Sequence, residues 1–351
     1  MKKILLIILC IFTFAGVSFA VIKSQNTNQP DNQSNSIKEI EKKIENYTKA
    51  IQVNPEDAGA YNNRGVAKGE IQNYIGAIVD FDKAIKLNPN YADAYMNRGV
   101  AKGYLQDYNG EIEDYNQAIK LNPNNYNAYY NRGIAKGNLK DYKGAIEDYN
   151  KAIKLNPNDA DTYYNRGNAK DELQDYKGAI EDYNQAIKLN PNYAEAYNNR
   201  GFAKGKLQDY KGEIEDYNQA IKLNPNYVKA YYNRGFAKDE LKDYKGAIGD
   251  YNQAIKLKPD DADAYINRGI AKGNLQDYKG EIEDYNQAIK LNPNDADTYY
   301  NRGVAKDDLK DYKGALEDFK IAKELAKKQG DTELYNLAEE SIKEVQEYIK
   351  K

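Results

Sequence analysis

A period of 34 residues is the feature that most constrains this chain. Eight of its nine prolines fall on that step, at Pro55, Pro89, Pro123, Pro157, Pro191, Pro225, Pro259 and Pro293. The tripeptide Asn-Arg-Gly recurs on the same step, eight times from Asn63 to Asn301. Eight copies at one spacing, without insertions, predict a solenoid in which each copy packs on its neighbours.

Each copy is predicted to form two short amphipathic helices. In the copy spanning 128–157, apolar and small residues recur every three or four positions in two stretches. Asp141 lies where it would cap the second helix, and Pro157 ends that helix. Gly133 and Ala145 are small where the two helices must approach closely. Because one such pair cannot bury both its faces alone, stacking of copies must supply the core.

These residues resemble the tetratricopeptide repeat, whose pattern is matched by Tyr129, Gly133, Ala145, Tyr149, Ala152 and Pro157. The resemblance implies an all-α, right-handed superhelical α-solenoid of stacked helix–turn–helix repeats. It also implies that the first helices line a concave groove that binds peptides or proteins. The eight repeats are predicted at 58–91, 92–125, 126–159, 160–193, 194–227, 228–261, 262–295 and 296–325.

The array is predicted to end in capping helices. Residues 37–57 match only a second helix followed by its proline, so we interpret them as an N-terminal half-repeat. Residues 330–351 are amphipathic, and they are predicted to form a C-terminal capping helix with a polar outer face.

The N-terminus indicates export. Lys2 and Lys3 precede an apolar stretch, and Ser18-Phe19-Ala20 fits a cleavage site, so residues 1–20 are predicted to be a secretory signal peptide. An uncleaved anchor and a lipoprotein are the alternatives. Residues 21–36 are rich in Asn, Gln and Ser, which predicts a flexible linker. We therefore expect a periplasmic or secreted protein of the cell envelope.

Composition excludes several kinds of site. The chain has no His and one Cys, so no His-based triad, His-ligated zinc site or intrachain disulfide is available. A net charge of -3 provides no global basic footprint for nucleic acid. The glycines are periodic and form no phosphate loop. We therefore predict no catalytic residue, no metal site and no cofactor.

Charged residues recur in the two helices of every copy. An Arg stands where the family usually has Leu, and an Asp occurs in the second helix. We interpret these as structural ion pairs that orient packed helices, the alternative being a ladder of anion sites. The predicted pairs join Arg64, Arg98, Arg132, Arg166, Arg200, Arg234, Arg268 and Arg302 to Asp80, Asp114, Asp148, Asp182, Asp216, Asp250, Asp284 and Asp318, respectively.

Two further departures bear on stability. Glu111, Glu213 and Glu281 replace a small Ala, and we expect their carboxylates to reach solvent or a nearby cation, in slightly looser helix pairs. Gly144 and its equivalents replace a family Glu that would complete a capping box, so Gly144→Glu is predicted to raise the melting temperature.

By family analogy, the predicted groove is lined by Tyr130, Tyr164, Asn165, Asn168, Asn199, Phe202, Lys206, Lys229, Tyr232, Asn233 and Phe236. The Asn of Asn-Arg-Gly either bonds the backbone of an extended ligand or is bonded within the array. Asn168, Asn199 and Lys229 match three slots of the family's clamp for a C-terminal carboxylate. Tyr164 and Asn233 stand where that clamp needs cations, which argues against it.

The sequence thus predicts a non-enzymatic scaffold that binds protein or peptide along its groove. No nucleic acid, metal or further membrane contact is expected, and the oligomeric state stays open. A glycan-binding or peptidoglycan-binding envelope protein is the alternative, because aromatic rings beside amides suit sugars as well as peptides. A regulatory arm of an enzyme complex is a weaker alternative.

Overall fold

The computed structural model describes residues 30–350, with side chains from Ile37 onward. Every regular element in this part of the chain is an α-helix. The described residues divide into two compact units, 30–191 and 192–350, which we describe separately.

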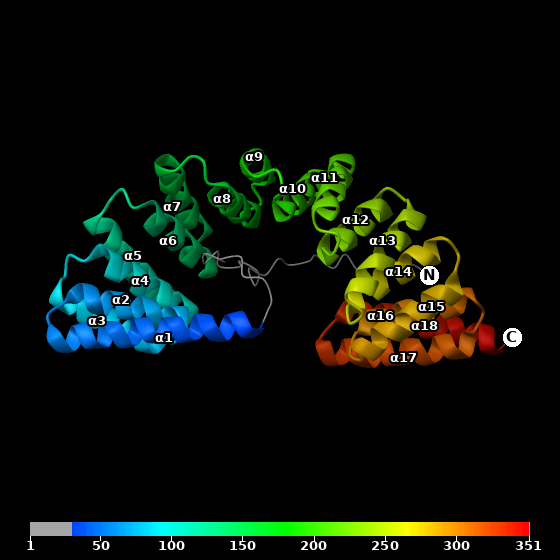
Figure 1. Ribbon diagram of the computed structural model, residues 1–351. Helices are drawn as coiled ribbons and strands as arrows, with labels where there is room; N and C mark the ends of the chain where they lie inside the picture. Colours follow the sequence, from blue (N-terminus) through cyan, green and yellow to red (C-terminus); the bar gives the residue numbers. More distant parts are fainter. Residues whose placement is uncertain (1–29, 351) are drawn as a thin grey trace. The chain divides into compact units, whose positions relative to one another are not determined.

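The unit 30–191 contains nine helices (Figure 1). An N-terminal helix, α1 (Pro30–Val53), packs against α2, and four helix pairs follow, each pair packing on the next. Their bounds are α2 Ala58–Glu70, α3 Tyr74–Leu87, α4 Ala92–Tyr104, α5 Tyr108–Leu121, α6 Tyr126–Asn138, α7 Tyr142–Leu155, α8 Ala160–Glu172 and α9 Tyr176–Leu189.

The unit 192–350 repeats this arrangement and ends in a long hairpin. In both units the first helix of a pair also touches the first helix of the next. The bounds are α10 Ala194–Lys206, α11 Tyr210–Leu223, α12 Val228–Glu240, α13 Tyr244–Leu257, α14 Ala262–Asn274, α15 Tyr278–Leu291, α16 Ala296–Asp308, α17 Tyr312–Gln329 and α18 Thr332–Lys350. The predicted all-α stack of helix–turn–helix pairs is therefore confirmed.

The two ends of the described chain differ in detail from the predicted boundaries. Helix α1 begins at Pro30, so residues 30–36 are helical and the predicted flexible linker 21–36 is wrong for that part. A proline fits there because the first turn of a helix uses no backbone N–H. At the other end, α17 continues four residues past the predicted repeat and stops at Gly330, whose φ is 76°. The signal peptide prediction, residues 1–20, lies outside the described residues.

A recurrent ring on the second helix forms the core of each repeat. Tyr149 of α7 is buried, and a Cβ added to Gly133 of α6 would lie 2.7 Å from its ring. Phe81 and Gly65 are related in the same way in the first repeat. The glycine of Asn-Arg-Gly is therefore needed for close packing of two helices, as the small-residue pattern predicts.

The turn between the two helices of a repeat has a left-handed residue in every copy. Its φ lies between 62° and 65° at Gln72, Gln106, Lys140, Gln174, Gln208, Lys242, Gln276 and Lys310. The next residue, an Asp or Asn, caps the second helix: its side chain accepts a hydrogen bond from the backbone N–H of the third residue of that helix. Each turn therefore carries strain that glycine would relieve.

Candidate functional site

The repeated arginines are bound inside the array. In the seventh repeat the guanidinium of Arg268 donates two hydrogen bonds to Asp284, with lengths of 3.0 and 2.5 Å. Lys272 approaches the second carboxylate oxygen of Asp284 at 2.8 Å. All eight arginines named above contact the Asp of their own repeat in this way, and each Asp also receives a lysine.

The same arginines also join neighbouring repeats. Arg268 Nη1 donates to Asn252 on the second helix of the preceding repeat at 2.7 Å. Its guanidinium carbon lies 5.4 Å from the centre of the Tyr265 ring, a cation–π distance. Equivalent bonds to the preceding repeat are made by Arg98, Arg132, Arg166, Arg234 and Arg302. Through these contacts each such guanidinium links three helices. Few of its N–H groups then remain to bind an anion, which argues against a ladder of anion sites.

The Asn of Asn-Arg-Gly makes a second set of bonds between repeats. Its amide nitrogen donates to the side chain 35 residues earlier in the chain. Asn97 donates to Asn62 at 3.0 Å, and Asn165 donates to the hydroxyl of Tyr130 at 3.0 Å. Further along the chain, Asn233 donates to Asn198 and Asn267 to Tyr232, at 3.3 and 2.6 Å. For these four copies the structure therefore agrees with an Asn bonded within the array.

Asn301 is a copy in which this pattern fails and no other bond replaces it. The residue 35 positions earlier is Ile266, which offers no acceptor. Asn301 is 1% exposed, and neither its amide nitrogen nor its amide oxygen has a hydrogen-bond partner in the described part of the chain. The period alone could not predict this, because the bond depends on a residue in the previous copy.

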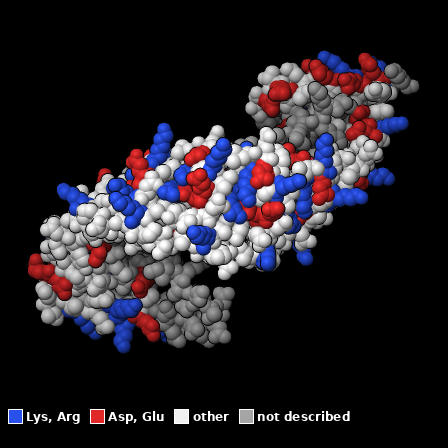
Figure 2. Space-filling view, turned by 90° about the horizontal axis from the view of Figure 1, so that it is seen from above, with Lys and Arg blue, Asp and Glu red and all other residues white. Residues whose placement is uncertain are grey.

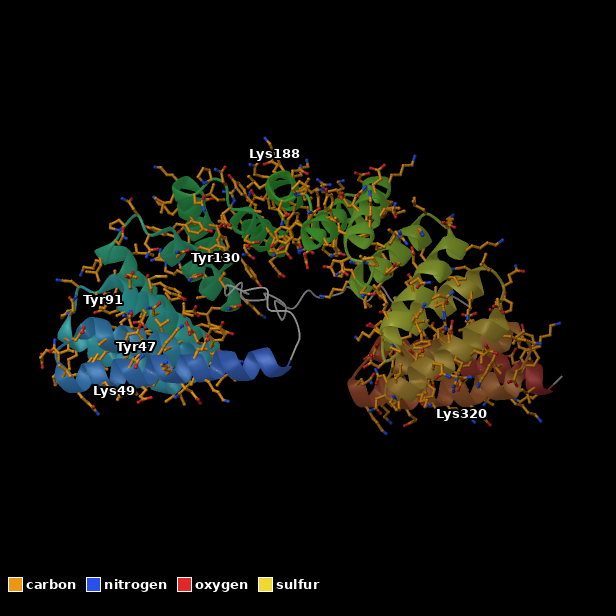
Figure 3. The ribbon with its side chains drawn as sticks, in the orientation of Figure 1. Tyr47, Lys49, Tyr91, Tyr130, Lys188 and Lys320 are labelled. Carbon is orange, nitrogen blue, oxygen red and sulfur yellow. The ribbon has the colours of Figure 1, made fainter. Side chains whose placement is uncertain are left out.

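In the unit 30–191, the predicted groove residues lie on α6 and α8. Figure 3 labels Tyr130 on α6, where it is half-buried and accepts the bond from Asn165. Asn168 of α8 accepts a bond of 2.9 Å from the Tyr183 hydroxyl, and the ring of Tyr164 lies 6.0 Å from that of Tyr183. By contrast, Lys188 at the end of α9 is exposed and points away from the helices (Figure 3). Polar groups of Tyr130, Asn165 and Asn168, which were predicted to meet a ligand, therefore bond within or between the repeats.

In the unit 192–350, an apolar row follows the first helices. Phe202 of α10, Phe236 of α12 and Ile270 of α14 occupy equivalent positions and are partly exposed. Helix α12 touches both α10 and α14. Lys206 lies 4.9 Å above the Phe202 ring, and Lys229 is exposed two turns before Phe236. We call Phe202, Phe236 and Ile270 the apolar row.

The other predicted residues of this unit contribute differently. Tyr232 is buried and accepts the bond from Asn267, while Asn233 donates to Asn198. Asn199 accepts a bond of 3.1 Å from Asn198. Because the clamp residues Asn168, Asn199 and Lys229 divide between the two units, the carboxylate clamp stays a prediction.

The first helices carry carboxylates at their N-terminal ends in the same unit. Asp263 lies in the first turn of α14 and Asp297 in the first turn of α16. Burial and the neighbouring Asp295 and Asp331 raise the pKa of Asp297 to about 6. Burial, with Asp261 and Asp295 nearby, raises the pKa of Asp263 as well. Asp263 lies two turns before Ile270, so an acidic edge adjoins the apolar row. On the face seen in Figure 2, by contrast, cationic and anionic side chains are intermixed.

The glutamates that replace a small Ala are buried, contrary to the expectation that they reach solvent, while Glu213 does have a cation, Lys206, among the charged groups near it. Glu111, Glu213 and Glu281 are 1%, 6% and 0% exposed. Each accepts a hydrogen bond, 3.0 to 3.1 Å long, from the hydroxyl of the tyrosine four residues later. Each also lies over a glycine of the first helix, such as Gly103, which provides the room that looser packing was expected to provide.

The glycine at the start of the second helix has a reason that sequence reasoning missed. The backbone N–H of Gly144 donates to the carboxylate of Asp141 at 3.0 Å. A Cβ on Gly144 would lie 2.2 Å from the other oxygen of that carboxylate. Gly144→Glu would therefore displace the cap that it was predicted to strengthen, so it is not expected to raise the melting temperature.

Two further features of the described residues concern metal binding and membrane crossing. No group of three or more acidic or cysteine side chains there is arranged to hold a metal ion. Within 30–350, no helix combines the length and the apolar character that crossing a bilayer requires.

Comparison with known proteins identifies the class. A family model described as TPR repeat matches seven consecutive segments between residues 69 and 306, and a model described as tetratricopeptide repeat matches 296–329. The chain belongs to the tetratricopeptide repeat family. No curated protein matches it.

Solved structures resemble the fold. A tetratricopeptide repeat protein from Parabacteroides merdae has a TM-score of 0.54 at 22% sequence identity. The match covers 70% of this chain and 98% of that protein's chain. A structure of pilF from Pseudomonas aeruginosa has a TM-score of 0.51 at 19% identity, covering 59% and 94%. A structure of MamA has 28% sequence identity and a TM-score of 0.45. The match covers 47% of this chain and 91% of the MamA chain.

Proposed function

We propose that this protein is a non-enzymatic scaffold that binds an extended segment of a partner protein along the first helices. The apolar row carries this proposal. Phe202, Phe236 and Ile270 are apolar and partly exposed at equivalent positions of helices that lie side by side. Repeats of this family typically bind proteins or peptides, and aromatic side chains are favoured at such contacts.

The surroundings of the row favour a particular partner chemistry. Asp263 and Asp297 form an acidic edge at the N-terminal ends of α14 and α16. A segment that combines apolar side chains with Lys or Arg would cover the row and neutralise this edge. The Tyr and Asn side chains that favoured a glycan ligand mostly make bonds between repeats, so a protein ligand is the better supported of the two.

We further propose that the protein acts in the cell envelope. This rests on the basic and apolar character of residues 1–20. Fractionation of producing cells, with detection of the mature N-terminus, tests it. A cytoplasmic protein that retains Met1 would refute export.

Selection of peptides on the purified protein tests the binding proposal. Selected peptides should combine apolar and basic residues, and Phe236→Ala should weaken their binding at least tenfold in calorimetry. Lys245→Ala is the matched control, because Lys245 is exposed on the second helix of the same repeat. Equal losses in both variants, or no selectable peptide, would overturn the proposal.

A further inference from the structure

Six repeats place one carboxyl between their two helices; the three glutamates of this set are buried and the three aspartates are half-buried. In three it comes from the second helix, opposite a glycine of the first. In the other three it comes from the first helix, at the position of that glycine, and the second helix has an alanine at the position of the glutamate. The two sets are Glu111, Glu213 and Glu281, opposite Gly103, Gly205 and Gly273, and Asp171, Asp239 and Asp307, which occur with Ala179, Ala247 and Ala315. We call these six residues the inter-helix carboxyls.

No repeat has a carboxyl on both sides of this position. The limited room between the two helices explains why a second carboxyl is absent. A Cβ at Gly205 would lie 2.4 Å from an oxygen of Glu213. A second side chain there would therefore overlap the first, and a second carboxylate would add repulsion in a buried place. The repeats at 58–91 and 126–159 have glycine and alanine, which shows that the fold does not require the carboxyl.

Glu213 illustrates the surroundings. Its carboxyl is 6% exposed and accepts a 3.0 Å bond from the Tyr217 hydroxyl of its own helix. The charged groups that face it are Lys206 from α10, Glu240 from α12 and Asp209, which caps α11. Burial raises the pKa of Glu213 to about 7, although the hydrogen bond from Tyr217 and the charge of Lys206 both act to lower it.

The neighbouring repeats have similar environments. Asp239 of α12 accepts a 2.8 Å bond from Tyr251 of α13 and faces Glu240 and Asp243. Burial raises the pKa of Asp239 to about 7, and burial with Asp107 nearby does the same for Glu111. One carboxyl oxygen in each of Glu111, Asp239 and Asp307 is buried without a hydrogen-bond partner in the described residues. A buried oxygen without a donor favours the protonated acid over the carboxylate.

We propose that the inter-helix carboxyls take up protons as the repeats fold, so that the helix pairs become more stable on acidification and less stable as these groups ionise.

The sign follows from proton linkage. A group whose pKa is higher in the folded than in the unfolded chain stabilises the fold below its unfolded pKa. That stability is lost as the pH rises through the folded pKa. For Glu213 the two values are about 7 and 4.5, a difference of about 2.5 units. Its ionisation would raise the unfolding constant of its repeat by up to about 300-fold.

Urea unfolding of the full chain between pH 5 and pH 8 tests the proposal. The unchanged protein should lose stability as the pH rises. Glu213→Gln mimics the protonated acid and keeps an acceptor for Tyr217, so it should be more stable than the unchanged protein at pH 8 and lose less between the two pH values. Glu215→Gln is the matched control, because Glu215 is exposed on the same helix, and its profile should follow the unchanged protein.

Parallel pH profiles for the unchanged protein and Glu213→Gln would overturn the proposal. A carbon-13 titration of the Glu213 carboxyl in the unchanged chain provides a second measurement that does not depend on whether the variant folds. A midpoint near 7 supports the proposal, and a midpoint near the ordinary value of 4.5 refutes it.

Discussion

The same substitution at two equivalent glycines is expected to have opposite effects on stability. Gly69 and Gly273 occupy the same position in the first helices of their repeats. A Cβ on Gly69 would meet nothing within 4 Å, whereas a Cβ on Gly273 would lie 2.3 Å from an oxygen of Glu281. Gly69→Ala is therefore a matched control for Gly273→Ala.

The magnitudes follow from these contacts. In a helix interior, Ala is more favourable than Gly by about 0.8–1 kcal/mol; Gly69 is the next-to-last residue of α2, so Gly69→Ala should stabilise by up to about that amount. Gly273→Ala gains the same propensity but must move the Glu281 carboxyl, which is 0% exposed and bonded to Tyr285 at 3.1 Å. Overpacking costs about 1–3 kcal/mol, and a lost buried hydrogen bond costs about 1–3 kcal/mol. The net loss should be about 1–5 kcal/mol.

Urea denaturation followed by circular dichroism measures both variants, and hydrogen exchange shows whether the repeat at 262–295 opens first. Glu281→Ala should relieve the overlap, so the double variant Gly273→Ala/Glu281→Ala should be more stable than the sum of the two single changes predicts. If Gly273→Ala stabilises the protein as much as Gly69→Ala does, the assigned overlap is wrong.

Two further predictions concern the contacts between and within repeats. Arg268→Lys should destabilise by about 2 kcal/mol in thermal or urea unfolding, because lysine cannot bond Asp284 in two places and also reach Asn252; an unchanged midpoint would contradict this role. Gln208→Gly should stabilise by about 0.5–1 kcal/mol, because φ is 65° at this turn; a lower melting temperature would show that the turn is not strained.

The ion pairs of the site were predictable because both residues of each pair lie in the same repeat. The pairing of Arg268 with Asp284 joins the two helices of a repeat, so a repeated cation and a repeated carboxylate are enough to suggest it. The bond from Arg268 to Asn252 was not foreseen, because Asn252 belongs to the preceding repeat and its approach depends on how repeats stack. The orphaned Asn301 was missed for the same reason.

The buried glutamates show a second limit. A glutamate in place of a small residue was expected to seek solvent or a cation, as an isolated buried charge must. The facing Gly273 and the Tyr285 hydroxyl instead enclose the Glu281 carboxyl. All three residues are visible in the sequence, but their contact appears only when two helices are placed against each other.

The sequence by itself determined the helix pairs, their number and their stacking as an all-α array. The sequence has a 34-residue period, with a proline after each second helix and a glycine facing each buried ring. Such short helix pairs bury their apolar residues by stacking on one another. The tertiary structure decided which polar groups bond inside the array and which carboxyls lose solvent. Burial and hydrogen bonding depend on distances between helices, which sequence spacing within one helix does not specify.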